Sequence, residues 1–98
     1  MPDKLTSMRT FVAAARGGSF VFAADKLGIS PQMVARHITA LEHQLSARLL
    51  NRTTRSQSLP PAGEQYLNRC EAIIDAVNQS DNAATGHSTL PAGTFRIN

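Results

Sequence analysis

Four side chains near the start of one predicted helix have the types and the spacing that reading DNA bases requires. Gln32, Ala35, Arg36 and Thr39 recur at intervals of three, one and three positions, so a helix would present them on one face. Arginine can donate two hydrogen bonds to guanine, glutamine can pair with adenine, and an alanine methyl group can touch the methyl group of thymine. The sequence therefore predicts a DNA-reading surface, and the alternative is a surface helix whose polar side chains are merely solvated.

The segment that follows carries a second group of basic and hydroxyl side chains: Arg52, Thr53, Thr54 and Arg55. We predict a hairpin in which Leu49-Leu50 and Ser58-Leu59 are short strands and residues 51–57 form the turn. Threonine hydroxyls bond phosphate oxygens, and an arginine in a narrow minor groove reads DNA shape. The hairpin would then be a two-stranded wing beside the duplex. The alternative is a soluble turn whose arginines serve only solubility.

The helix that carries the reading residues has a clear start and a clear buried side. Ser30-Pro31 is a strong start signal, because serine caps free N–H groups and proline suits the first helical position. Ser30 and the N–H groups at this positive helix end would also suit a DNA phosphate. The helix should run to about Ala47. Its apolar stripe recurs at intervals of four, three and four positions: Val34, Ile38, Leu41 and Leu45.

The preceding helix completes a helix-turn-helix. It should span Phe20–Leu27 and begin after the cap Ser19. Ala24 is small where the two helices cross, Gly28 permits the tight turn, and Val34 packs into the angle between the helices. Such a motif places its second helix in the DNA major groove.

An N-terminal helix over residues 4–16 would complete a three-helix core, ended by Gly17-Gly18. Its expected buried face is formed by Leu5, Met8, Val12 and Ala15, with Phe11 beside them.

A long amphipathic helix is predicted after the hairpin, because residues 64–84 contain no proline or glycine. Its apolar stripe consists of Tyr66, Leu67, Cys70, Ile73, Ile74 and Val77. This stripe is too long to be covered by a small three-helix core, so we predict an antiparallel partner helix from a second copy and hence a homodimer. The alternative is that the helix folds back onto its own domain. Cys70 has no second cysteine to pair with and is interpreted as a buried small apolar residue.

Composition and charge fit a small cytoplasmic nucleic-acid-binding domain. The chain has 98 residues and a net charge of +3, and residues 1–62 carry a net +5 while residues 63–98 carry −2. No apolar run is long enough for a membrane span, and the N-terminus lacks a secretory signal. His37, His43 and His87 form no cluster with catalytic or metal-binding spacing, so we expect no enzyme activity, no metal and no cofactor.

The sequence resembles the N-terminal DNA-binding domain of LysR-type transcriptional regulators across residues 4–67. The matching motifs are Gly18-Ser19-Phe20, Ala23-Ala24-Asp25-Lys26-Leu27-Gly28-Ile29-Ser30, Val34, Arg36, Ile38, Leu41-Glu42, Leu45, Leu49-Leu50, Asn51-Arg52-Thr53-Thr54-Arg55, Leu59 and Ala62-Gly63. Each motif alone is weak, but their joint order and spacing are specific.

The resemblance implies a mainly α fold, with a winged helix-turn-helix followed by a long linker helix that dimerises. The expected domains are residues 1–60 for the winged helix-turn-helix, 61–85 for the linker and dimerisation helix, and 86–98 for a hinge that begins a missing effector-binding domain. A small-molecule effector would act only through that missing domain. By analogy, the base-reading residues are Pro31, Gln32, Ala35 and Arg36, and the minor-groove arginine is Arg55.

The chain departs from the family pattern at several of these positions. Ala35 replaces the usual serine, which removes a hydroxyl that can bond a base or a phosphate. His37 replaces the usual glutamine and is expected near the DNA-facing side. Ser46 replaces the usual glycine, and Pro60 replaces a threonine that would cap the linker helix. Arg48 stands where proline is common and adds a candidate phosphate contact.

Other interpretations remain open at this stage. Glu42 is hypothesised to pair with Arg52 and orient it, and the alternative is a plain exposed helix glutamate. A non-specific DNA-binding protein would show the same basic face without sequence preference. A winged helix that binds only other proteins need not gather Arg36, Arg52 and Arg55 on one face.

Overall fold

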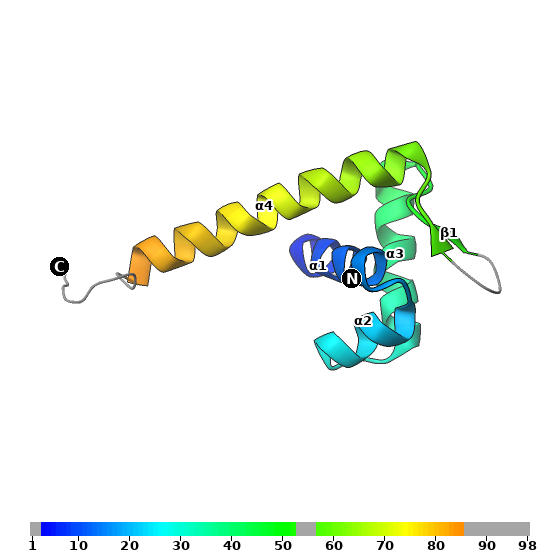
Figure 1. Ribbon diagram of the computed structural model, residues 1–98, viewed down its shortest axis with the longest axis horizontal. Coiled ribbons are helices and arrows are strands. Elements are labelled where there is room, and N and C mark those ends of the chain that lie inside the picture. The colour runs from blue at the N-terminus through cyan, green and yellow to red at the C-terminus, as the bar shows by residue number, and fades with distance from the viewer. Residues whose placement is uncertain (1–2, 53–56, 86–98) are drawn as a thin grey trace.

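The computed structural model describes residues 3–52 and 57–85, which form four helices and two short strands around one small core. Three short helices, α1 (Lys4–Gly17), α2 (Phe20–Leu27) and α3 (Pro31–Leu45), pack together. Two short strands, β1 (Asn51–Arg52) and β2 (Gln57–Ser58), lead to the long helix α4 (Pro61–Thr85). In Figure 1, α4 crosses above α1 and its C-terminal half extends well beyond the three-helix cluster.

Side chains cap the start of each of the first three helices. The Ser19 hydroxyl accepts a hydrogen bond from the Phe22 N–H at 3.0 Å, and the Ser30 hydroxyl accepts one from the Met33 N–H at 3.1 Å. Asp3, which the sequence analysis did not single out, accepts one from the Thr6 N–H at 3.1 Å. Each cap satisfies a donor that the helix leaves unpaired, which explains why the chain turns into a helix at these points.

The helix ends are set by residues in the left-handed conformation. Gly18 ends α1 with φ 82°, and Gly28 ends α2 with φ 72°. The predicted bounds of α2 are confirmed. α3 ends at Leu45 rather than about Ala47, because Ser46 adopts a left-handed φ of 50° and stops the helix.

The core lies where α1 meets the other three helices. Phe11 and Ala14 have no exposed surface, whereas Leu5, Val12 and Ala15 are only partly buried. The buried face of α1 therefore differs from the predicted one and is centred on Phe11 and Ala14. The reason is that α1 contacts α2, α3 and α4, so its buried arc is wide and includes the hydroxyl residues Ser7 and Thr10.

The link between α3 and the strands is held by Glu42. Its Oε2 accepts hydrogen bonds from the backbone N–H groups of Leu49 at 2.9 Å and Leu50 at 3.3 Å. Both leucines are 1% exposed and lie in the core rather than in a strand. The first strand begins two residues later than predicted and the second begins one residue earlier, with Asn51 paired to Ser58 and Arg52 to Gln57.

The first half of α4 belongs to the same core. A Cβ at Gly63 would clash with the carbonyl oxygen of Leu49, so only glycine allows α4 to pack this closely. Leu67 is 3% exposed, Cys70 is fully buried, and the Tyr66 ring lies 5.9 Å from the Phe11 ring.

These contacts correct the assignment of Leu67 and Cys70 to the dimer interface, because both side chains are buried inside their own domain. Tyr66 packs against the same core but is only partly buried. For these residues the structure agrees with the alternative interpretation, in which the long helix folds back onto its own domain. An amphipathic pattern indicates that a face is buried but not which surface buries it. The prediction that Cys70 is a buried apolar residue is confirmed, and burial raises the pKa of its thiol to about 11.

An ion pair fastens the end of α1 to α4. Arg16 Nε donates to Glu71 Oε2 at 2.7 Å, and Arg16 Nη2 donates to Glu71 Oε1 at 2.6 Å. This two-pronged geometry is the strongest arrangement that an arginine and a carboxylate can form. The Arg16 hydrogen bonds lower the pKa of the Glu71 carboxyl below its usual value of 4.5.

The left-handed Ser46 predicts a stabilising substitution. Ser46→Gly should raise the free energy of unfolding by about 0.5–1 kcal/mol, because glycine adopts positive φ without steric cost. Urea unfolding followed by circular dichroism measures the change. Ser46→Ala keeps the Cβ and should give no such gain. A glycine variant no more stable than the alanine variant would show that Ser46 is not strained.

The Arg16–Glu71 pair predicts a pH dependence with a definite sign. Because the folded state lowers the pKa of Glu71, the stabilisation is present above about pH 4.5 and is lost as the pH falls through the lowered pKa. Arg16→Gln should move the Glu71 pKa back toward 4.5 in a carboxyl ¹³C NMR titration. Arg9→Gln, on the same helix, should leave it unchanged, and an unchanged Glu71 pKa in Arg16→Gln would contradict the pairing.

Candidate nucleic-acid interface

α3 has one side in the core and the opposite side in solvent. Val34 and Ile38 are fully buried and Leu41 is 1% exposed, so this side of the helix faces the core. The opposite side carries the four predicted reading residues: Gln32, Ala35, Arg36 and Thr39. Three of them are exposed, and Ala35 is half-buried. The helix therefore presents these side chains together, as the spacing predicts.

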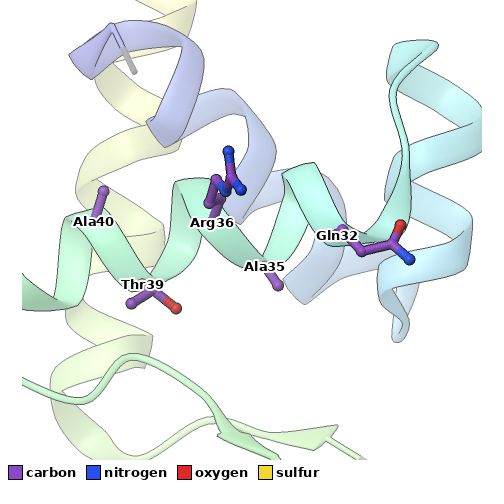
Figure 2. Close-up of a pocket in the computed structure, with 5 residues that line it drawn as sticks. All are labelled: Gln32, Ala35, Arg36, Thr39 and Ala40. Atoms are coloured by element: carbon purple, nitrogen blue, oxygen red, sulfur yellow. The ribbon is translucent and has the colours of Figure 1, made fainter. Parts of the chain in front are cut away.

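The reading residues line a shallow groove of about 540 Å³ together with Ala40. Figure 2 shows their side chains spread along α3, with Ala35 and Thr39 pointing toward one edge of the helix and Arg36 toward the other. Most of the groove wall is apolar, and Arg36 is its only charged side chain. Such a surface can place apolar groups against base methyl groups and a guanidinium against a base edge.

A second, more polar groove of about 430 Å³ continues the first, because Thr39 lines both. Its other lining residues are Glu42, His43, Ser46 and Arg48. The exposed strip thus runs from Gln32 at the start of α3 to Arg48 beyond its end. Ala40 and His43 also belong to this strip, although neither was predicted as a DNA-reading residue from the sequence. The signal for Ala40 was available, because it follows Arg36 by four positions.

The start of α3 adds backbone donors to this surface. Ser30 and Pro31 are both exposed, and Pro31 is the first residue of the helix. The Ser30 oxygen accepts from the Met33 N–H, so its own hydroxyl hydrogen can still point to an external acceptor. The positive end of the helix dipole lies at the same place.

The placement of His37 on the DNA-facing side is corrected. Its side chain is only 6% exposed, and Nδ1 lies 3.0 Å from the Ser7 hydroxyl oxygen on α1. The ring therefore points into the interface between α1 and α3 and cannot contact DNA. A histidine looks polar in a sequence, but the rotation of α3 set by Ile38 and Leu41 turns this position inward.

The predicted contacts of the hairpin are placed only in part. Arg52 pairs with Gln57 through its backbone, and Arg48 is exposed in the second groove. The Arg52 side chain and the residues Thr53, Thr54 and Arg55 lie outside the described residues. Glu42 is not a plain exposed glutamate, because its carboxylate binds two backbone N–H groups of the following segment.

The described ranges hold no group of three or more histidine, cysteine, aspartate or glutamate side chains arranged to bind a metal ion. Over residues 3–52 and 57–85, none of the helices is long and apolar enough to cross a membrane.

Comparisons with known proteins place this geometry in a family. Residues 5–64 match the family model for bacterial regulatory helix-turn-helix proteins of the lysR family. An HTH-type transcriptional repressor of Pseudomonas aeruginosa is 39% identical over 95 residues, which cover 97% of this chain and 30% of that protein.

Two solved structures are similar over most of the chain. The BenM DBD in complex with catB site 1 DNA matches with a TM-score of 0.80 and 31% identity, covering 89% of this chain and 98% of that one. The CbnR DBD–DNA complex matches with a TM-score of 0.79 and 27% identity, covering 87% and 98%. This chain spans about a third of the length of the curated relatives it matches. The α3 geometry and the match over residues 5–64 lead to one conclusion: the chain belongs to the LysR family of bacterial helix-turn-helix regulatory proteins.

Proposed function

We propose that this chain binds double-stranded DNA in a sequence-specific manner as the DNA-binding part of a transcription regulator. The observation that carries the proposal is the exposed face of α3, where Gln32, Ala35, Arg36 and Thr39 lie together opposite a fully buried face. The two similar domains whose structures contain DNA support it. A non-specific DNA-binding role would not need an apolar groove beside a single arginine.

In this proposal α3 lies in the major groove, which is about 12 Å wide and admits a helix. Arg36 reads a guanine, Gln32 pairs with an adenine, and Ala35 contacts a thymine methyl group. Ser30 and the first N–H groups of α3 bind a phosphate near one end of the helix. Arg48, exposed beyond the other end, binds a second phosphate and so helps to set the register of the helix on the duplex.

The paired strands β1 and β2 are proposed to form the base of a wing. The two strands are antiparallel, with Asn51 opposite Ser58 and Arg52 opposite Gln57. The wing would bring Arg52, Thr53, Thr54 and Arg55 to the backbone and the minor groove. Arg55 is proposed as the arginine that reads minor-groove shape.

A homodimer is proposed to form through the distal half of α4. Ile73 is 46% exposed, and Ile74 and Val77 are half-buried. The helix continues for about two more turns past Val77, so these apolar side chains lie on a regular helix that extends away from the core. An isolated helix of this length is marginal in water unless its apolar face is covered. A second copy of α4 running antiparallel would cover it and present two α3 helices to two half-sites of a near-palindromic operator.

The other parts of the proposed role lie beyond this chain. Because the chain spans about a third of its curated relatives, an effector-binding domain is proposed to follow it, and a small-molecule effector would act there. We propose a cytoplasmic location and no cofactor for the DNA-binding part itself.

The base-reading role of Arg36 predicts a specificity defect. A duplex enriched by the unmodified chain from a random library supplies the specific site. Arg36→Ala should lose about 1–3 kcal/mol of binding free energy on that duplex and relax the preference at one base pair. Arg9→Ala, which removes an arginine outside the α3 grooves, is the matched control. Equal losses by Arg36→Ala on the enriched duplex and on random DNA would make Arg36 a phosphate contact only.

The distal α4 interface predicts a change of oligomeric state. Ile73→Glu places a charge on the exposed apolar side of α4 and should convert the dimer to a monomer in sedimentation equilibrium. Val21→Glu is the control, because Val21 is an exposed apolar residue on α2, 68% accessible and away from α4. If Ile73→Glu still sediments as a dimer, the interface lies elsewhere.

A further inference from the structure

One polar contact crosses the buried interface between α1 and the DNA-facing helix. The buried polar side chains of the described residues are Ser7, Thr10 and His37. The Thr10 hydroxyl donates to the Thr6 carbonyl oxygen within α1 at 2.8 Å, so it does not connect two helices. Ser7 and His37, 30 positions apart, instead face each other across the interface with 3.0 Å between Oγ and Nδ1.

This contact is shielded from water on both sides. Ser7 is 2% exposed and His37 is 6% exposed. Either neutral tautomer of the imidazole can make the bond, because the serine hydroxyl both donates and accepts. A second hydrogen bond between α1 and α3 joins Lys4 Nζ to Gln44 Oε1 at 3.1 Å and is exposed, where water competes for both groups. The Ser7–His37 bond therefore restrains the orientation of α3 relative to α1 more strongly than the Lys4–Gln44 bond does.

The apolar contacts of α3 do not by themselves fix its rotation finely. Hydrophobic burial of Val34, Ile38 and Leu41 is non-directional, so it decides which side of α3 faces the core but sets the exact rotation less sharply than a directional bond does. A hydrogen bond depends on both distance and direction, and it weakens steeply outside its narrow geometry. His37 directly follows Arg36, so a restraint on His37 is also a restraint on the direction of the Arg36 side chain.

The accuracy with which α3 must be oriented to read bases can be estimated from how far a rotation of the helix moves its side chains. Side-chain atoms lie about 5–6 Å from the helix axis, so a rotation of about 10° moves them by about 1 Å. Hydrogen bonds between protein and base edges tolerate only about 0.5 Å in donor–acceptor distance. A rotation of this size exceeds that tolerance, so it would weaken a two-pronged contact of Arg36 with guanine more than it weakens the looser phosphate contacts.

We propose that Ser7 and His37 are positioning residues for DNA recognition: their hydrogen bond sets the rotation of α3 on α1 and thereby aims Arg36 at its base. The inference rests on the proposed function, because it concerns how the same surface reaches its accuracy. Ser7 and His37 contact no DNA themselves. Their loss would lower the preference for the specific duplex over random DNA, rather than the general affinity for DNA.

The first experiment compares Ser7→Ala with Thr10→Val. Both variants remove one buried hydroxyl from α1, but only Ser7→Ala removes the bond to α3. The measured quantity is the ratio of Kd for random duplex DNA to Kd for the duplex enriched by the unmodified chain. Ser7→Ala should reduce this ratio about 2- to 10-fold, and Thr10→Val should leave it unchanged. An unchanged ratio in Ser7→Ala would overturn the proposal.

Two further variants separate an effect on the orientation of Arg36 from an effect on the stability of the fold. His37→Asn keeps a polar amide near the position of Nδ1 and should preserve much of the ratio. The double variant Ser7→Ala/His37→Leu leaves no buried polar group unpaired, so it should recover the melting temperature lost by Ser7→Ala. The proposal expects the double variant to keep the low ratio. A double variant that recovers both the melting temperature and the ratio would show that the bond is only structural.

A measurement without DNA distinguishes this inference from the proposed function. Residual dipolar couplings of backbone amides report the orientation of α3 relative to α1 in the unmodified chain and in Ser7→Ala. We expect a changed orientation of α3 in the variant, and an unchanged one would overturn the inference. If the chain enriches no duplex at all, the proposed function fails, while the dipolar couplings still decide whether this bond orients the helix.

Discussion

The fold depends on how one helix is divided between core and solvent. α3 must bury Val34, Ile38 and Leu41 completely, and burying three such side chains contributes several kcal/mol. Because the helix is rigid, this burial also decides which residues remain outside. The cap Ser30 and the left-handed Gly28 place the helix start where the burial requires it. The exposed groove is thus a consequence of the core rather than an independent surface.

The junction after α3 determines where the long helix goes. Glu42 binds the N–H groups of Leu49 and Leu50, and both leucines enter the core. Gly63 then lets the start of α4 lie directly against the Leu49 backbone. The Arg16–Glu71 pair holds α4 to α1 about two turns after Gly63. A single continuous helix therefore serves as a core element in its first half, and its apolar side becomes exposed at Ile73, where the second half begins.

Sequence patterns predicted the parts of this fold that rest on local chemistry. The caps Ser19 and Ser30, the bounds of α2 and the two faces of α3 follow from residue types and spacing, because caps and helical periodicity act over a few positions. Parts that depend on tertiary packing were not predicted. The burial of Ser7 and His37 could not be predicted, because these polar residues are 30 positions apart and no local pattern shows that they meet. Leu67 and Cys70 are buried inside their own domain, which the sequence could not predict because periodicity does not tell which surface covers the apolar stripe.

The central claim is that α3 reads bases in the major groove, and guanine N7 reports this contact directly because it is exposed only in that groove. We would measure methylation interference at guanine N7 on the duplex enriched by the unmodified chain. If α3 lies in the major groove, interference should occur in two clusters about 10 base pairs or a multiple of that apart, and Arg36→Ala should weaken it at one guanine per half-site. Tight, selective binding that is insensitive to N7 methylation at every guanine of an enriched duplex would contradict this claim.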